Sequence, residues 1–268
     1  MLNAPSNDQV KPCKGSRRPF PRYRETVLDI IRVSQEVPSF PLVRTMQLGQ
    51  LSCIRKSARV RIAWSTLFAK AYGLVCAKTP ELREIFVPYP HKYLYRHPHS
   101  VASISVHRKD DMGNERLIFG RWKRPELTPL IELQNQLDSF SLAPINEVFG
   151  EGLMLERRSA LIRRFVWWWV TRWTGRIRAA HVGTFSISSL GGHGALNAYH
   201  PLVTTLSLAF GPICEDGRCE VVLICDHRTL DGVMGSKALE MLERVLATEI
   251  AEETRNLPQL EFSHKFCG

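Results

Sequence analysis

The sequence predicts an α+β protein in which helices cover one mixed sheet. Side chains in the stretches 43–50 and 100–107 alternate between apolar and polar, which indicates strands with one buried face. In the stretches 60–77 and 233–250, apolar residues recur at helical spacing and polar residues occupy the opposite face. With 268 residues, of which 44% are hydrophobic, the chain can bury a full core.

The N-terminal half begins with a polar, proline-containing tail. Residues 1–21 are basic and show no periodicity, so we expect them to be disordered. From 22 to 35 apolar residues recur at helical spacing, and prolines close this short helix. The strand at 43–50 follows, and the helix at 60–77 ends before Pro80.

The C-terminal half is predicted to supply most of the sheet. A helix is expected at 127–140, and the turn Glu-Asp-Gly-Arg at 215–218 separates two strands. The long amphipathic helix at 233–250 follows the last strand. The strands expected in this half lie at 100–107, 117–120, 184–188, 202–210 and 220–225.

The positive charge of the chain indicates an anionic partner. The net charge is +10, and residues 156–178 contain seven arginines and one glutamate. Such an excess favours a phosphorylated cofactor, an acidic carrier protein, anionic lipid or nucleic acid. No recognised nucleic-acid-binding motif accompanies these arginines, so nucleic acid ranks last among them.

Cysteine usage and hydropathy favour a cytoplasmic location. The seven cysteines include no CxxC pair, so we interpret them as free thiols rather than as a disulfide scaffold or zinc site. No secretory signal pattern is present, and the apolar run 165–170 is too short to span a bilayer. His97 and His99 are close in sequence, but no further ligands are identifiable, so no metal site is predicted.

The motif CDHRTLDG at 225–232 places a histidine directly after a predicted buried strand. A general base must have a pKa near neutrality and must be held rigidly, and a strand end holds His227 in this way. Asp231 and Gly232 suit a tight turn into the following helix. That turn could bring Asp231 beside His227 or let it hold an arginine that braces the site.

A second motif, GTFSISSLGGHG at 183–194, ends a predicted strand with two serines and a glycine-rich turn. A serine hydroxyl at this point could donate a hydrogen bond to a developing oxyanion. The glycines allow a ligand to approach the backbone. Because no GxSxG pattern is present, neither Ser188 nor Ser189 is expected to be a covalent nucleophile.

Together, GTFSISSLG and DHRTLDG resemble the catalytic domain of the 2-oxo acid dehydrogenase acyltransferases, the dihydrolipoyl acyltransferase cores. Chloramphenicol acetyltransferase shares that fold and an HxxxDG motif. The resemblance covers 22–252, which we interpret as an acyltransferase catalytic domain followed by a C-terminal tail at 253–268. It implies a mixed sheet covered by helices and a homotrimer, or multiples of trimers, with active sites between subunits.

The resemblance also implies roles for individual residues. His227 is the base that removes the acceptor's proton, and Ser188 is the oxyanion donor. Asp231 orders the site through an arginine, for which Arg24 is the candidate. The acyl group would pass directly from a coenzyme A or carrier-protein thioester to a small thiol, hydroxyl or amine acceptor. The coenzyme A contacts are not identifiable.

The sequence departs from this family in three respects. No lipoyl domain or lipoyl attachment site is present, the stretch between Ser188 and His227 is compact, and 155–180 is an Arg/Trp-rich segment expected to be helical. Three consecutive tryptophans at 167–169 span about 200° of a helix, so one core face cannot bury them all. Residues 161–173 could contact a subunit, a lipid surface or a greasy substrate. A non-catalytic trimeric scaffold is the alternative to an enzyme.

Overall fold

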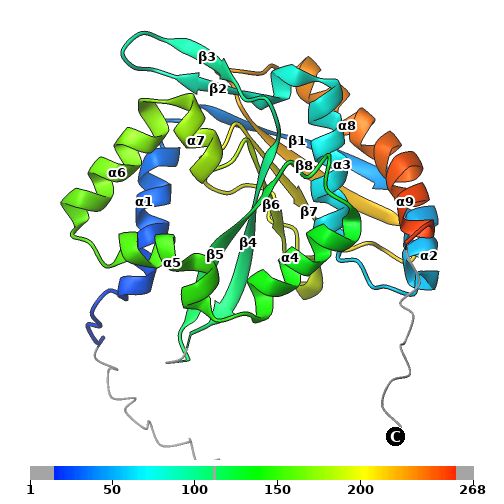
Figure 1. The fold of residues 1–268 in the computed structure, drawn as a ribbon, viewed down its shortest axis with the longest axis horizontal. Coiled ribbons are helices and arrows are strands. Elements are labelled where there is room, and N and C mark those ends of the chain that lie inside the picture. Colours follow the sequence, from blue (N-terminus) through cyan, green and yellow to red (C-terminus); the bar gives the residue numbers. More distant parts are fainter. Residues whose placement is uncertain (1–14, 111–112, 258–268) are drawn as a thin grey trace, which may run out of the picture.

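A six-stranded mixed sheet forms the centre of the computed structural model, which describes residues 15–110 and 113–257 (Figure 1). The strand order is β1-β8-β7-β6-β4-β5. β4, β6 and β7 run parallel to one another, whereas β5, β8 and β1 each run antiparallel to their neighbours. The six strands are β1 (Ser39–Gln47), β4 (Val101–Lys109), β5 (Glu115–Lys123), β6 (Phe185–Ser189), β7 (Leu206–Phe210) and β8 (Arg218–Asp226).

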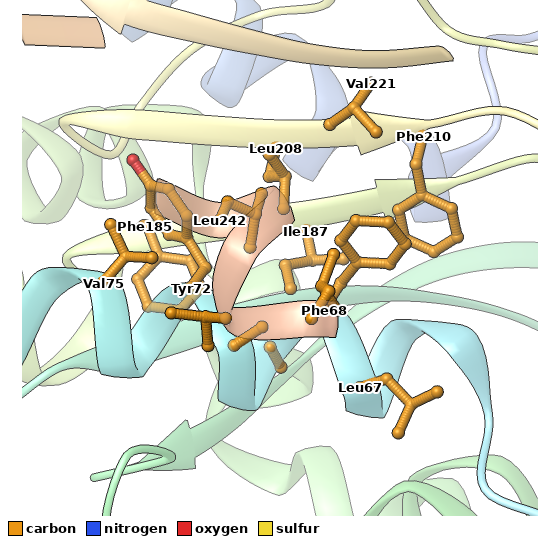
Figure 2. Close-up of a cluster of buried hydrophobic side chains, with 14 of the residues drawn as sticks. Leu67, Phe68, Tyr72, Val75, Phe185, Ile187, Leu208, Phe210, Val221 and Leu242 are labelled. Atoms are coloured by element: carbon orange, nitrogen blue, oxygen red, sulfur yellow. The ribbon is translucent and has the colours of Figure 1, made fainter. Parts of the chain in front are cut away.

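One face of the sheet packs against the main core helices. α3 (Trp64–Lys78) lies along this face beside α8 (Gly232–Val245) and α4 (Leu130–Leu142). Figure 2 shows the core between them, where Phe68 of α3 stacks on Phe210 of β7 at 4.2 Å between ring centroids. Full burial of one large apolar side chain in such a core stabilises the fold by about 1.5–3 kcal/mol relative to leaving it exposed.

The other helices lie around this layer. α2 (Gly49–Ser57) and α9 (Ala251–Arg255) lie together near the end of α8. A single π-helical turn at 246–250 connects α8 to α9. α1 (Glu25–Ser34), α6 (Ala160–Arg172) and α7 (Gly175–His181) form a separate group at the opposite edge of Figure 1. α5 (Ile145–Glu156) links α4 to α6, and the short hairpin β2 (Glu84–Val87) and β3 (Tyr93–Arg96) packs on α7.

The α+β class, the mixed sheet and the helical cover are confirmed. The main difference lies in the strand predicted at 43–50, because β1 starts at Ser39 and α2 already starts at Gly49. β1 is an edge strand, where Pro41 is tolerated within the ladder opposite Ile224. The strand predicted at 202–210 is confirmed only for Leu206–Phe210.

Regular structure in the described part of the chain extends from Arg22 to Arg255. It begins with a short 3-10 turn and ends with α9, so the last helix runs three residues past the predicted boundary at 252. Of the tails expected at 1–21 and 253–268, residues 1–14 and 258–268 lie outside the described residues.

Candidate active site

His227 is the first residue after β8, and three contacts hold it at the strand end. Its backbone N–H donates to the carbonyl of Pro38 at 2.9 Å. Its ring lies 4.7 Å from the ring of Phe40, measured between centroids. Its Nδ1 lies 3.0 Å from the carbonyl oxygen of Leu230. A carbonyl only accepts, so Nδ1 carries the proton and Nε2 keeps a free lone pair. The ring is exposed in the single chain, so this lone pair can accept a proton.

A buried ionic cluster supports the turn that carries His227. Asp226 is fully buried, and its two carboxylate oxygens accept from Nε and Nη2 of Arg228 at 2.8 and 2.6 Å. The guanidinium of Arg178 also lies near this carboxylate and donates to the carbonyls of Phe86 and Val203. Burial lowers the pKa of Arg178 to about 10, and the charge of Asp226 partly offsets this effect.

Asp231 closes the same turn, but by capping a helix rather than by pairing with an arginine. Its Oδ1 accepts from the backbone N–H of Met234 at 2.8 Å, which makes it the N-cap of α8. Gly235 lets this helix approach the sheet, because a Cβ there would lie 2.4 Å from Leu42. Among the described residues of this single chain, Asp231 forms no ion pair with Arg24.

Ser188 and His227 lie at opposite ends of the strands of the sheet. Ser188 is the fourth residue of β6 and is paired with Ala209 of β7, which in turn is paired with Val222 of β8. β6 and β8 run in opposite directions, so their carboxyl ends point away from each other. His227 is five positions after Val222, which corresponds to about 16 Å along the strand. One chain therefore brings His227 and Asp231 together but not Ser188.

Three hydrogen-bonded polar side chains that the sequence did not indicate lie near Ser188, and they are partly or fully buried. Ser186, two residues earlier on the same face, donates to Ser207 Oγ at 2.7 Å, and this hydroxyl lies 2.6 Å from Nε2 of His200. Burial lowers the pKa of His200, so its ring stays neutral near pH 7. The three residues come from β6, β7 and a loop, and only the fold brings them together.

A cavity of about 680 Å³ opens where β6 ends. Ser189 and Gly191 line it together with three basic side chains and one tryptophan, and the acidic residues Glu215 and Asp216 also contribute to the lining. Burial and the nearby charge of Arg61 lower the pKa of Arg55, whose guanidinium lies 5.3 Å from the centre of the Trp64 ring. Because two cations repel each other here, a bound anion would be favoured. The basic side chains and the tryptophan that could contact such an anion are Arg55, Lys56, Arg61 and Trp64.

Two buried thiols of β8, Cys219 and Cys225, are poor nucleophiles. Cys225 is fully buried in the core face two residues before His227, and burial raises its pKa to about 12. Burial likewise raises the pKa of Cys219 to about 12. A thiol with such a pKa is almost entirely protonated at neutral pH, so a covalent acyl-cysteine at these positions is not favoured. Cys53, Cys76, Cys214, Cys219 and Cys225 are all free, as expected.

Comparison with known proteins rests on structure. No protein-family model and no curated protein sequence matches the chain. The probable dihydrolipoamide acetyltransferase of Listeria monocytogenes 4b F2365 superposes with a TM-score of 0.65 at 16% identity, covering 92% of this chain and 98% of that one.

Two further solved structures match equally well. One is the dihydrolipoamide acetyltransferase of Azotobacter vinelandii, solved to investigate the role of a serine, a histidine and an asparagine in its catalytic mechanism. It has a TM-score of 0.65 and 16% identity over 94% of this chain and 99% of that one. The other is the cubic core of the pyruvate dehydrogenase multienzyme complex, with a TM-score of 0.65 and 17% identity over the same shares. Identities this low establish the fold alone, and this chain has the fold of the dihydrolipoyl acyltransferase catalytic cores.

Proposed function

We propose that this protein is an acyltransferase whose active site forms between two subunits, with His227 from one chain and Ser188 from the next. The observation that carries the proposal is the state of His227, which is an exposed residue whose Nδ1 donates to the Leu230 carbonyl and whose Nε2 has no hydrogen-bond partner within the described chain. A base presented in this way needs a partner surface, and the remote position of Ser188 supports a second copy of the chain as that surface.

In the proposed reaction, Nε2 of His227 takes the proton from a thiol, hydroxyl or amine acceptor as that atom attacks the thioester carbonyl. The carbonyl oxygen becomes an oxyanion, to which the Ser188 hydroxyl donates a hydrogen bond. The carbon–sulfur bond then breaks, and the imidazolium returns its proton to the departing thiolate. No acyl-enzyme forms, because positioning, a base and an oxyanion donor suffice.

Asp231 acts as a positioning residue in this scheme. By capping α8 it fixes the turn 227–231, and that turn supplies the Leu230 carbonyl that orients the imidazole. In the Azotobacter vinelandii protein, the histidine and asparagine under study are four residues apart, which is also the spacing of His227 and Asp231. Both side chains, Asn and Asp, are good helix caps, which fits a capping role at this position.

The cavity beside Ser189 supports coenzyme A, or the phosphopantetheine of an acyl carrier protein, as the acyl donor. Its basic side chains suit phosphate groups, and Trp64 offers a surface for stacking. The thioester of such a donor would extend toward Ser188, one residue before Ser189. The proposal therefore uses the acyl donor as a substrate and needs no lipoyl group on this chain.

The assembly is proposed to be a homotrimer or a multiple of trimers. A cyclic arrangement repeats the same contact between the His227 end of one chain and the Ser188 end of the next until the ring closes. The cubic core to which this chain is similar supports assembly from such units. A scaffold without catalysis is the competing outcome of the experiment below.

The direct test is thioester turnover. Incubating the protein with a panel of acyl-CoAs and a small thiol acceptor should release coenzyme A, and His227→Ala should lower this rate by about 10²–10⁴-fold. Release of coenzyme A is followed by chromatography against a reaction without acceptor, because transfer to a thiol leaves the total number of free thiols unchanged. A trimer that turns over no acyl-CoA in either form would instead establish the scaffold.

Arg61 provides a test of the donor cavity that does not involve the chemical step. Arg61→Gln should raise the KM for acyl-CoA about tenfold at unchanged kcat, because one charge-assisted hydrogen bond to phosphate is lost. The KM for the matching acyl-pantetheine, which lacks the phosphates, should not change. Lys123→Gln, an exposed change at the end of β5, is the control. Equal effects on both donors would remove phosphate binding from this cavity.

A further inference from the structure

One side of α6 presents an apolar surface that no other element of the described chain covers. We name Leu161, Phe165, Trp169 and Trp173 the α6 ridge; their exposed fractions are 75%, 61%, 37% and 38%. Spacing by four places successive members on one side of the helix. Most large apolar side chains of a folded domain are buried, so a contiguous row of this kind marks a contact surface.

The ridge is ordered rather than a set of loose side chains. The rings of Phe165 and Trp169 stack at 6.4 Å between centroids, and those of Trp169 and Trp173 stack at 5.1 Å with an angle of 14°. Trp168 connects this row to Tyr89 in the β2–β3 loop, at 6.2 Å. The resulting surface is broad, aromatic and preorganised.

Arginines without acidic partners flank the ridge. The sequence from 157 to 181 contains no Asp or Glu. Arg163 and Arg172 find carboxylates on α1 or just after it, Arg163 pairing with Glu25 and Asp29 and Arg172 with Glu36. Four others are exposed and form no ion pair within the described part of the chain: Arg157, Arg158, Arg164 and Arg176. Their charge faces solvent.

A small groove between α1 and α6 adjoins this surface. It has a volume of about 230 Å³ and is lined by Arg164, Trp167 and Trp168 and by two ion pairs, Arg32 with Asp29 and Arg172 with Glu36. The indole Nε1 of Trp167 is buried and has no hydrogen-bond partner within the described chain. This donor and the guanidinium of Arg164, which is unpaired within the described chain, suit the oxygens of a phosphate.

We infer that the α6 ridge and its flanking arginines dock this protein on the surface of an anionic lipid bilayer. Among the described residues no helix has both the length and the apolar character needed to cross a bilayer. A helix with exposed Leu, Phe and Trp beside Arg instead lies in the interface plane. Tryptophan prefers the level of the lipid headgroups, and each arginine near an anionic surface adds about 1 kcal/mol of attraction.

The charge distribution favours lipid over a second copy of the chain and over nucleic acid as the occupant of this surface. A second copy that docked by the same surface would bring these arginines against like charges. Nucleic acid would use rings for stacking, but Leu161 and Ile162 continue the surface with exposed aliphatic side chains, which gain by burial in lipid. Both alternatives are outcomes of the experiment below.

The docking surface ends near the turn that carries His227. Arg172, at the end of α6, pairs with the carboxylate of Glu36, and the backbone carbonyl of Glu36 accepts from Arg228 at 3.3 Å. Docking through α6 would thus bring the side of the molecule on which His227 lies toward the bilayer. The inference goes beyond the proposed acyl transfer and does not depend on it.

The test is vesicle binding by the full chain. Sedimentation is measured with vesicles of phosphatidylcholine alone and of an equimolar mixture with phosphatidylglycerol. We expect binding to the mixed vesicles, weakened by added salt, and a blue shift of tryptophan emission on binding. The double variant Phe165→Ser/Trp169→Ser should bind about tenfold or more weakly, and Arg158→Gln/Arg164→Gln should reduce the preference for phosphatidylglycerol.

Matched changes far from the ridge serve as controls. Leu142→Ser removes an apolar side chain of α4 that is more exposed than any of the ridge, and Arg255→Gln removes an exposed arginine from α9, which lies at the opposite edge of Figure 1. Both should bind vesicles like the unchanged protein. The inference is overturned if the mixed vesicles capture no protein, or if the ridge variant binds them unchanged. A ridge variant that only alters the oligomer mass, or an unchanged protein that binds oligonucleotides but not vesicles, also overturns it.

Discussion

Mixing two inactive variants, His227→Ala and Ser188→Ala, in one oligomer restores activity to about a third of the unchanged level. This result is expected if each site takes its histidine from one chain and its serine from the next. In a trimer that contains both variants, one neighbouring pair in three combines a chain with intact His227 and a chain with intact Ser188 in the required order. Each variant alone should be slowed by about a hundredfold or more.

The geometry of the sheet leads directly to this expectation. β6 and β8 run in opposite directions on either side of β7, so Ser188 and His227 lie at opposite ends of the strands. No single chain can bring the Ser188 hydroxyl to the His227 imidazole without disrupting β7. The measurement uses co-expressed variants carrying two different purification tags, so that only mixed oligomers are assayed. The control mixes either variant with a chain carrying both changes, where no complete site can form. Mixed oligomers as slow as this control would show that the two residues do not share a site.

The sequence predicted the parts of the site that depend on local order. A buried strand followed by His227 and a helix preceded by Asp231 are adjacent in the chain, and the structure has both. The pairing of Asp231 with Arg24 could not be checked by such reasoning, because it depends on where α1 packs. The orphan N–H groups at the start of α8 need an acceptor whatever the tertiary context, and the side chain of Asp231 satisfies one of them.

Sequence patterns did not predict the contacts between segments that are distant in the chain. Arg178 looked like one member of a basic segment, yet it is fully buried near Asp226, 48 positions away. Arg163 from the same segment is buried against Asp29, whereas Arg164 beside it is exposed. A helical pattern assigns a residue to a face, but only the packing of α6 and α7 decides which arginines find carboxylates.

Asp226→Ala should lower the free energy of unfolding by about 3–5 kcal/mol, because it leaves the buried guanidinium of Arg178 without a nearby negative charge. The loss also releases Arg228, which donates to both oxygens of this carboxylate and helps to hold the turn before His227. For a domain of this size we expect the Tm to fall by about 10 °C. Urea unfolding followed by circular dichroism measures the change.

The chain contains its own control for this prediction. Asp216 and Arg218 form the same pair, an aspartate and an arginine two residues apart, with Nε 2.5 Å from Oδ2. Their side chains are 48% and 61% exposed, whereas those of Asp226 and Arg228 are 1% and 23% exposed. Water solvates the exposed charges in either state, so Asp216→Ala should leave the urea midpoint unchanged. If the two variants shift the midpoint equally, burial is not what makes Asp226 important, and the cluster around Arg178 does not stabilise the turn that presents His227.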